Sequence, residues 1–417
     1  MQAIVLAAGK GTRMKSEKPK VLHEALGRPI LDYVLRNLES VGIRKPVVVV
    51  GAGADQVKAF LGKRAVTALQ AEQRGTGHAV LMAQKALAGY SGDVVIWPGD
   101  MPLVKLETLK AFLRSHRKSG AAVSVLSAIR DNPASYGRIL RRAGRFCGIR
   151  EELDATEEER RICEVNTGVY LFDKKKLFEA LKKVRPQNKK NEIYLTDTIE
   201  ILSGEGEKLE AFPFADSSEG QGVNSRVDLA EVVECLNARN IRKHQENGVM
   251  FVKPEQSVVA SDVKIGQDTV VYPWSYIEKD VQIGSGCQIG PFAKIRSGTV
   301  IGDGSVIGSF VEVNRSRLGK KVSAKHLSYL GDALIGDETN IGAGTITANY
   351  DGKNKHQTRI GKKVLVGSDT IFVAPVVVSD LARTGAGAVL TAGSVIKKGQ
   401  VAVGVPAKTL NRGKAKP

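Results

Sequence analysis

Residues 281–313, VQIGSGCQIGPFAKIRSGTVIGDGSVIGSFVEV, repeat with a period of six. An aliphatic residue returns at every sixth position and is often followed by glycine, as in Ile283-Gly284 and Ile301-Gly302. This period matches neither the 3.6 residues of a helical turn nor one long strand. It is typical of a parallel β-helix, in which each hexad forms one side of a coil and its aliphatic side chain points inward.

The repeat extends beyond this stretch in both directions. It starts at Ile265, is interrupted at 349–359, and returns from Ile360 to Ile396. The interruption is polar, and long loops that leave a solenoid tend to carry function. The sequence predicts a rigid solenoid over about 258–405. A repeat alone names no chemistry, so a purely supporting role stays open.

Composition narrows the class of protein. The 417 residues suffice for two or three domains, and the formal net charge of +18 suits polyanionic small substrates as well as nucleic acid or membrane surfaces. No Lys/Arg block alternates with aromatic residues, so we expect no nucleic-acid partner. No CxxC pair, signal peptide or membrane-length apolar run is present, so we expect a cytoplasmic protein with no membrane partner.

The first half of the chain alternates apolar runs with helical patterns. The runs 3–6, 46–51 and 93–97 predict strands, and the spacing of Leu31, Val34 and Leu38 predicts a helix over 30–41. Such alternation predicts a parallel sheet that binds ligands at the carboxyl ends of its strands. We therefore expect an α/β domain over 1–224, a linker helix over 225–248, and the solenoid with a short basic tail over 249–417.

A glycine-rich loop directly follows the first predicted strand. It reads LAAGKGTRM over 6–14, and Lys18-Pro19-Lys20 follows shortly after. Small residues let backbone N–H groups approach a phosphate, and Arg13 and Lys20 can neutralise its charge. The segment is neither a Walker loop nor GxGxxG, and glycines alone would fit a tight strand–helix turn as well.

The motif GxGTRM followed by KPK resembles the one found in the sugar-1-phosphate nucleotidyltransferases. Further segments match one bacterial family in order: 70–79 (QAEQRGTGHA), 99–100 (GD), 136–138 (YGR), 164–168 (EVNTG), 191–197 (NEIYLTD), 222–224 (GVN), 326–332 (HLSYLGD), 341–347 (IGAGTIT) and 349–352 (NYDG). That family is the bifunctional N-acetylglucosamine-1-phosphate uridyltransferase / glucosamine-1-phosphate N-acetyltransferase. The resemblance implies an α/β Rossmann-like nucleotidyltransferase domain followed by a left-handed parallel β-helix that forms homotrimers.

For the first domain, the resemblance implies a site for UTP, N-acetylglucosamine-1-phosphate and Mg²⁺. Asp100 and Asn224 would ligate the metal, while Arg13 and Lys20 would neutralise phosphate charge and support catalysis. Residues implied in nucleotide and sugar binding are Leu6, Ala7, Ala8, Gly9, Lys20, Gln70, Gly75, Thr76, Gly99, Asp100, Gly137, Glu151, Asn166 and Asn224. The sugar phosphate would attack the α-phosphorus in line, without a protein nucleophile. An Asp at a strand end can also be only a helix cap.

For the solenoid, the resemblance implies acetyl transfer from acetyl-CoA to glucosamine-1-phosphate. His326 would take the proton of the substrate amine, since imidazole titrates near neutral pH, and Glu312 would orient it. The implied sugar-phosphate residues are Arg296, Tyr329, Asn340 and Lys355, and the implied coenzyme residues are Ala343, Asn349, Tyr350, Ser368 and Ala386. A single His is more often structural, and Glu312 alone would read as a solvated residue.

Several positions depart from the family pattern. Trp97-Pro98 precedes Gly99 where the family commonly has a Tyr, and proline donates no backbone hydrogen bond. Asn314 replaces a lysine used on the sugar phosphate, with Arg315 next to it as a substitute, and Gly404 replaces an arginine used on coenzyme A. The tail residues that offer charge to coenzyme phosphates instead are Arg412, Lys414 and Lys416.

The leading hypothesis is therefore a two-activity enzyme that makes UDP-N-acetylglucosamine, a precursor of peptidoglycan and lipopolysaccharide. The alternative is a monofunctional sugar-1-phosphate nucleotidyltransferase whose β-helix only trimerises or regulates, which leaves HLSYLGD unexplained. A third class, a non-catalytic binding subunit, would not need Arg13, Lys20 and Asp100 together.

Overall fold

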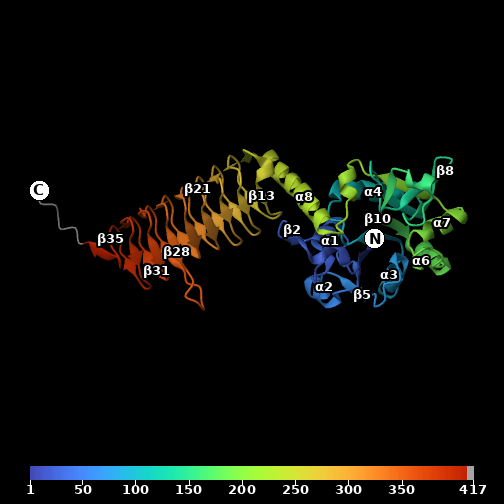
Figure 1. Cartoon of the computed structure of the whole chain (residues 1–417), viewed down its shortest axis with the longest axis horizontal. Coiled ribbons are helices and arrows are strands. Elements are labelled where there is room, and N and C mark those ends of the chain that lie inside the picture. The colour runs from blue at the N-terminus through green and yellow to red at the C-terminus, as the bar shows by residue number, and fades with distance from the viewer. Residues whose placement is uncertain (411–417) are drawn as a thin grey trace, which may run out of the picture. The chain divides into compact units, whose positions relative to one another are not determined.

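The computed structural model describes residues 1–410, and Figure 1 shows its helices and strands. These residues form two compact units, Met1–Val233 and a second unit that starts at Glu234. The division falls inside the predicted linker helix, which is observed as α8 (Arg226–Glu246).

A nine-stranded sheet organises the first unit, with the order β11-β7-β10-β6-β1-β4-β5 and a β8–β9 hairpin joined to β10. Its strands are β1 (Gln2–Ala7), β4 (Val47–Val50), β5 (Val66–Leu69), β6 (Asp93–Pro98), β7 (Val123–Ile129), β8 (Arg138–Arg142), β9 (Arg145–Arg150), β10 (Glu164–Asp173) and β11 (Leu209–Pro213). β6, β1, β4 and β5 are parallel, and β10 runs antiparallel to both β6 and β7. The carboxyl ends of β1, β6 and β7 therefore lie at one edge, together with the start of β10.

Helices cover both faces of this sheet. α1 (Ile30–Ser40), α2 (Ala54–Leu61) and α4 (Leu106–Ser119) share one apolar cluster with Val5 and Val95, whereas α3 (Thr76–Met82), α6 (Lys174–Lys183) and α7 (Asp197–Gly204) share another with Ile4 and Ile96. Burial on both faces explains why the central strands are continuous apolar runs rather than alternating ones.

The shorter elements of the chain are η1 (Thr12–Met14), η2 (Lys20–Leu22), β2 (Glu24–Ala25), β3 (Arg28–Pro29), η3 (Lys85–Leu87), α5 (Glu157–Arg160), η4 (Ser217–Gly220) and η5 (Pro254–Gln256).

The second unit is a solenoid with three long parallel sheets. The first contains β12 (Met250–Phe251), β15 (Val270–Val271), β18 (Gln288–Ile289), β21 (Val306–Ser309), β24 (Ser323–His326) and β27 (Asn340–Ile341). The second contains β13 (Val258–Val259), β16 (Tyr276–Ile277), β19 (Lys294–Ile295), β22 (Glu312–Asn314), β25 (Tyr329–Gly331), β28 (Ile346–Ala348), β30 (Ile371–Val373) and β33 (Val389–Leu390). The third contains β14 (Lys264–Ile265), β17 (Gln282–Ile283), β20 (Val300–Ile301), β23 (Arg317–Leu318), β26 (Ala333–Ile335), β29 (Thr358–Ile360), β31 (Val376–Val378) and β34 (Val395–Ile396); β32 (Arg383–Thr384), β35 (Val401–Val403) and β36 (Lys408–Leu410) close the end.

The coil register explains the hexad period. Ile265 pairs with Ile283 and Ile283 with Ile301, so one coil takes three hexads. The aliphatic positions point inward as predicted, and Ile289, Ile295 and Ile307 are fully buried. Some coils depart from this length: Val313 pairs with Leu330, one residue short of three hexads, and the coil that joins Ile335 to Ile360 contains the extra loop 349–357.

Large apolar side chains line one corner of the solenoid. Trp274, Phe292 and Phe310 occupy equivalent turn positions of successive coils, with ring centroids 6.3 Å and 5.0 Å apart. Leu327 continues the row on the next coil, and all four side chains are about half exposed or more. We call these four residues the apolar corner; soluble proteins rarely leave so continuous a row in water unless a partner covers it.

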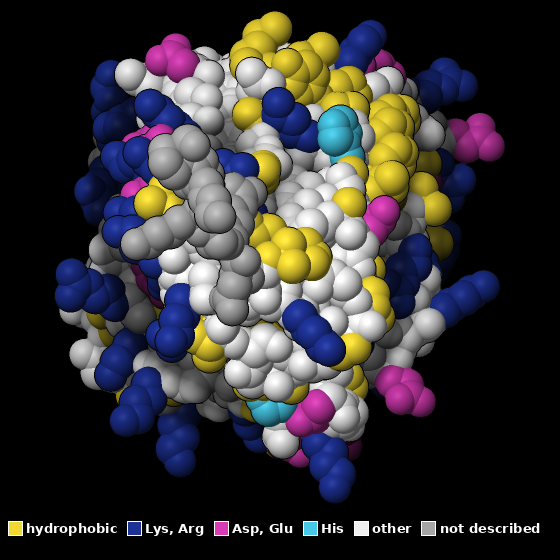
Figure 2. Space-filling view, turned by 90° about the vertical axis from the view of Figure 1, so that its left-hand side faces the viewer, with side chains coloured by type: hydrophobic (Ala, Val, Ile, Leu, Met, Phe, Trp, Pro, Cys, Tyr) yellow, Lys and Arg dark blue, Asp and Glu magenta, His cyan; other side chains and the backbone are white. Residues whose placement is uncertain are grey.

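The surface of the folded chain is rich in positive charge, as the net charge of +18 predicts. Lys and Arg side chains far outnumber Asp and Glu over the face shown in Figure 2. Within residues 1–410, no helix has the length and apolar character needed to cross a membrane.

Candidate functional site

A cavity of about 300 Å³ opens where β1, β5 and β6 end. Most residues implied to bind the nucleotide line it: Leu6, Ala7, Ala8, Gly9, Lys20, Gln70, Gly75, Thr76 and Asp100. The Gln70 side-chain amide donates to the Gly75 carbonyl over 3.1 Å, and Gln73 donates to the Ala8 carbonyl over 2.6 Å. These bonds fix the loops on both sides of the cavity.

Two other predicted residues lie outside this lining. Gly99 supports the turn after β6, because its N–H donates to the Leu6 carbonyl over 2.8 Å and a Cβ would meet Leu31 at 3.1 Å. Arg13 lies exposed on η1. Trp97 is fully buried among core residues and Pro98 lines the cavity, so the departure from the family pattern places an indole in the core and a proline ring at the site.

Asp100 and Asn224 converge on a single cation. The Lys20 ammonium forms an ion pair with the Asp100 carboxylate and donates to the Asn224 side-chain oxygen over 3.1 Å. The backbone sets this geometry, since the Val223 N–H donates to the Asp100 carbonyl over 2.9 Å and Asp228 accepts the Asn224 N–H over 2.8 Å. Carboxylate and amide oxygens are the ligands that Mg²⁺ prefers, so this pair fits the metal that the fold implies.

The residues implied at the sugar belong to neighbouring parts of the sheet: Gly137 directly precedes β8, Glu151 directly follows β9, and Asn166 is on β10. The Asn166 N–H donates to the Gly137 carbonyl over 2.8 Å, and its side chain donates to the Tyr170 hydroxyl over 2.7 Å. Glu151 accepts from the Thr196 hydroxyl over 3.0 Å. Burial raises the pKa of Glu151, and the Thr196 hydrogen bond opposes this only in part. The site therefore holds a carboxyl that ionises reluctantly next to the sugar residues.

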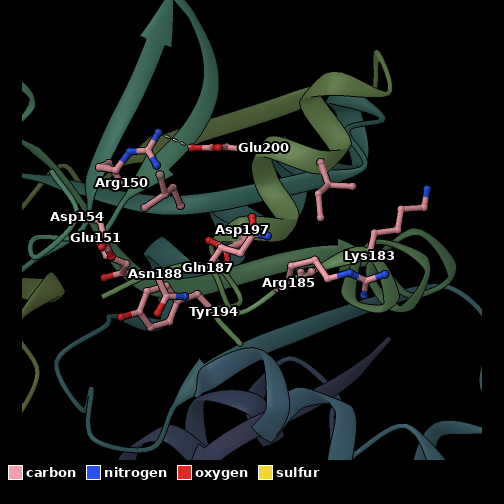
Figure 3. A pocket seen from close by; sticks show the side chains of 13 residues that line it. Arg150, Glu151, Asp154, Lys183, Arg185, Gln187, Asn188, Tyr194, Asp197 and Glu200 are labelled. Carbon is pink, nitrogen blue, oxygen red and sulfur yellow. Dashed lines mark ion pairs between the residues drawn. The ribbon is translucent and has the colours of Figure 1, made fainter. Parts of the chain in front are cut away.

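A second cavity of about 370 Å³ lies beside Glu151, between β9, α7 and the end of α6. Figure 3 shows Glu151, Asp154 and Tyr194 at one end and Lys183 and Arg185 at the other. Sequence reasoning did not single out Asp197 on its wall. Burial, with Glu200 and Glu151 nearby, raises the pKa of this carboxyl to about 6.

Asp197→Asn should raise the free energy of unfolding of the first unit at pH 8 by about 1–2 kcal/mol and leave it unchanged at pH 4. The folded pKa lies above the unfolded one, so the contribution of Asp197 to stability is fully present below pH 4 and is lost as the pH rises through about 6. Urea unfolding followed by Trp97 fluorescence, in a Trp274→Phe background, measures it. Asp55→Asn on the exposed surface of α2 is the matched control. An equal gain at both pH values would contradict the assignment.

On the solenoid, His326 lies exposed at the end of β24, in register with Ser309. Glu312 begins β22 on the neighbouring sheet and pairs in register with Tyr329. Its carboxylate accepts from Arg296 over 2.9 Å, and within residues 1–410 no hydrogen bond joins it to His326. In this structure Glu312 orients Arg296, and its role toward the imidazole stays a prediction.

Asp332 connects the residues around the sugar-phosphate positions. Arg315 binds it through two bonds of 2.8 Å and 2.7 Å, and the Asn349 side chain also donates to it. Burial opposes ionisation of Asp332, but these hydrogen bonds outweigh it and lower its pKa. In this structure Arg315 pairs with Asp332, and its role as a substitute for the missing lysine at Asn314 stays a prediction. Asn314 is itself buried and accepts from Arg315 over 3.1 Å.

The other sugar-phosphate and coenzyme residues occupy the coils that follow. Tyr350 and Lys355 pair across the polar loop as isolated bridge partners, and Asn340 is exposed on β27. Ala343, Ser368 and Ala386 follow Gly342, Gly367 and Gly385, which stack on three successive coils; a Cβ on Gly342 would approach the Gly367 backbone to 2.5 Å. Gly404 has a positive φ of 92° on the last coil. Arg412, Lys414 and Lys416 lie outside the described residues.

Some residues at the two sites were not predicted to have a role, although they lie in the motifs named above. Gln73 and Glu192 line the first cavity, and Asp332 ends HLSYLGD. Motif position marks such residues as candidates, but only the folded chain shows that Gln73 contacts Ala8 or that Asp332 holds Arg315 and Asn349.

Comparison with known proteins agrees with this arrangement. A MobA-like NTP transferase domain matches residues 3–193, and bacterial transferase hexapeptide repeats match residues 280–315. With the parallel sheets described above, these matches confirm the predicted fold class of a nucleotidyltransferase domain and a left-handed β-helix.

Curated relatives cover nearly the whole chain. The bifunctional protein GlmU of a Geobacillus species is 42% identical, covering 93% of this chain and 92% of the relative. GlmU of Heliobacterium modesticaldum has the same identity and coverages, and GlmU of Acetivibrio thermocellus is 40% identical over 94% of this chain and 92% of its own. The chain belongs to the family of bifunctional GlmU proteins.

Proposed function

We propose that the chain transfers acetyl from acetyl-CoA to glucosamine-1-phosphate and then transfers a uridyl group from UTP to the N-acetylglucosamine-1-phosphate formed, releasing pyrophosphate. The observation that carries this proposal is the convergence of Asp100, Asn224 and Lys20 at the sheet edge beside a nucleotide-sized cavity. The family of the chain supports the second activity. Residues 1–224 carry uridyl transfer and 249–417 carry acetyl transfer, joined by the helix over 225–248.

For uridyl transfer, the residues position two anions and neutralise their charge. Leu6 to Gly9, Gln70, Gly75 and Thr76 hold the nucleotide, while Gly137, Glu151 and Asn166 hold the sugar. Asp100 and Asn224 would hold Mg²⁺, which supplies charge stabilisation to the transferring phosphoryl group. Lys20 then leaves the side-chain oxygens of Asp100 and Asn224 and binds phosphate oxygens instead. Arg13 on η1 contacts the nucleotide from its exposed side.

For acetyl transfer, His326 takes the proton of the substrate amine as it attacks the thioester. Arg296, Tyr329, Asn340 and Lys355 bind the sugar phosphate, and Glu312 holds Arg296 in place. The stacked positions of Ala343, Ser368 and Ala386, together with Asn349 and Tyr350, line a path for the coenzyme along successive coils. The free thiol of coenzyme A leaves.

The solenoid assembles as a homotrimer in the cytoplasm, with further copies of the chain covering the apolar corner. The row ends at Leu327, next to His326, so a neighbouring solenoid packed there adjoins the imidazole. The four cysteines are unpaired, which fits a reducing compartment.

Replacing Phe292 and Phe310 with serine together should convert the trimer to monomers and lower acetyl transfer at least tenfold, with uridyl transfer retained. The stacked rings supply apolar area that only a partner buries, roughly 1.5–3 kcal/mol for each fully buried side chain. Analytical ultracentrifugation measures the assembly. Val395→Ser, an exposed apolar residue off this corner, is the matched control. A trimer that survives the double substitution would rule out this corner as the interface.

The two activities are tested in one incubation with glucosamine-1-phosphate, acetyl-CoA, UTP and Mg²⁺. Free thiol and pyrophosphate are recorded separately. We expect both, with pyrophosphate release dependent on acetyl-CoA when glucosamine-1-phosphate is the only sugar. Pyrophosphate that forms without acetyl-CoA, or thiol that never forms, would overturn the order or the second activity.

A further inference from the structure

Arg130 is the first residue beyond β7, at the sheet edge that carries the nucleotide site. Its N–H donates to the Cys163 carbonyl over 3.0 Å, which places it beside the start of β10. The carboxyl ends of β1 and β6, with Ala8 and Asp100, lie at the same edge. Arg130 is thus a cation at the ligand edge that neither the motifs nor the family resemblance assigned.

Among the described residues 1–410, the guanidinium of Arg130 has no anionic partner. Its Cζ lies 4.6 Å from the centroid of the Tyr136 ring, so it rests on the face of this tyrosine. Its Nε and Nη2 are buried and have no hydrogen-bond partner within residues 1–410. A stack on an aromatic ring offsets part of the cost of burying this charge, but a guanidinium is normally matched by a carboxylate or phosphate.

Neighbouring arginines, unlike Arg130, pair with glutamates. Arg138 pairs with Glu152 over 2.6 Å, and Arg141 pairs with Glu164 over 2.9 Å. Arg150 reaches Glu200 over 3.1 Å. Carboxylates are therefore plentiful around β8 and β9, yet within residues 1–410 none forms an ion pair with Arg130.

Tyr136 connects Arg130 to the metal pair. Burial raises the pKa of the Tyr136 hydroxyl. The positive charge of Arg130 lowers this pKa, and the negative charges of Asp228 and Asp100 raise it further. Asp228 accepts the Asn224 N–H over 2.8 Å. The Tyr136 hydroxyl is therefore near enough to Arg130, Asp228 and Asp100 to be influenced by the charges of all three.

The position of Arg130 in the sheet indicates which of the two substrates it would contact. The nucleotide cavity is lined from the β1 and β5 side of the sheet, whereas Arg130 and Tyr136 belong to the β7–β10 side. Gly137 follows Tyr136 directly, and its carbonyl accepts from Asn166, the residue implied at the sugar. An anion held here lies on the acceptor side of the Asp100–Asn224 pair.

We propose that Arg130, seated on the Tyr136 ring, binds the phosphate of the sugar-1-phosphate acceptor. This inference rests on the proposed uridyltransferase function and adds a phosphate-binding residue to that site. The phosphate supplies the anion that the guanidinium lacks, and Tyr136 restricts the orientation of its planar fork.

The test compares Arg130→Gln with the wild type in the uridyl-transfer assay. A charge-assisted hydrogen bond of about 1.5–3 kcal/mol corresponds to a roughly 10- to 100-fold rise in the KM for N-acetylglucosamine-1-phosphate. We expect this rise with the KM for UTP changed less than twofold, and an intermediate rise for Arg130→Lys. Arg141→Gln, on an exposed arginine already paired with Glu164, is the matched control and should leave both KM values unchanged.

N-acetylglucosamine without phosphate distinguishes phosphate binding from a general disturbance. As a competitive inhibitor it should bind the wild type and Arg130→Gln equally well. Equal weakening of this sugar, an equal rise in the KM for UTP, or no change in Arg130→Gln would each overturn the proposal. An unchanged KM for UTP reports that the first unit, which contains Arg130, is folded in the variant. A wild type without uridyl transfer would instead refute the proposed function itself.

Discussion

Asp100→Ala should lower uridyl transfer by on the order of a thousandfold or more and leave acetyl transfer within about twofold of the wild type. The substitution removes one of two oxygens that converge on a cation, and it leaves the Lys20 ammonium without its carboxylate. The remaining Asn224 amide carries no charge to hold a divalent ion. Pyrophosphate release and thiol release, measured on one preparation, separate the two effects.

Two further variants sharpen this experiment. Asp100→Asn keeps the size and an amide oxygen but removes the charge, so a comparable loss would attribute the effect to the anion rather than to a cavity. Asp55→Ala, at a fully exposed carboxylate of the same unit, should change neither activity. Parallel loss of both activities in a folded Asp100→Ala protein would contradict the division of the chain into two separate sites.

His326→Ala should lower acetyl transfer by on the order of a hundred- to ten-thousandfold with uridyl transfer unchanged, as expected for loss of a general base. The imidazole is exposed on β24, so its removal leaves no cavity and should not affect folding. Because the base only removes a proton from the amine, the deficit should shrink as rising pH deprotonates the substrate. The measurement is the pH dependence of thiol release from acetyl-CoA.

The neighbouring Lys325, also exposed on β24, provides the control. Lys325→Ala should keep the wild-type pH profile. A His326→Ala enzyme with a constant deficit at all pH values would assign the residue to substrate binding instead of proton transfer, and unchanged thiol release would remove His326 from the reaction.

Most of the fold could be predicted because the sequence is locally consistent. The hexad positions point inward, as Ile289 and Ile307 show, and the apolar runs become β1, β4 and β6 within a residue or so of their predicted bounds. The short coil after Val313 could not be predicted, since a one-residue change in coil length leaves the aliphatic spacing ambiguous. Strand order could not be read either, because pairing across the sheet depends on contacts between distant segments.

The candidate site divides in the same way. Asp100 and Asn224 are far apart in sequence, and the structure brings both side chains to the Lys20 ammonium, while their role as metal ligands stays a prediction. The partners of charged residues could not be predicted from the sequence: Arg315 pairs with Asp332, and its expected role toward the sugar phosphate stays a prediction. Arg130 lies in no quoted motif and Asp197 only ends one (191–197), and neither was assigned a role, because their environments arise from burial and from neighbours on other elements.

The ammonium of Lys20 provides Asp100 and Asn224 with a counter-ion from the chain itself. A free divalent ion that arrives by itself must displace this resident charge from Asp100, so it gains little. A nucleotide offers the lysine a different anion, which releases the two oxygens at the moment when they are needed. On the function proposed above, metal uptake and nucleotide uptake would thereby be interdependent, and the protein would not hold magnesium before its substrate binds.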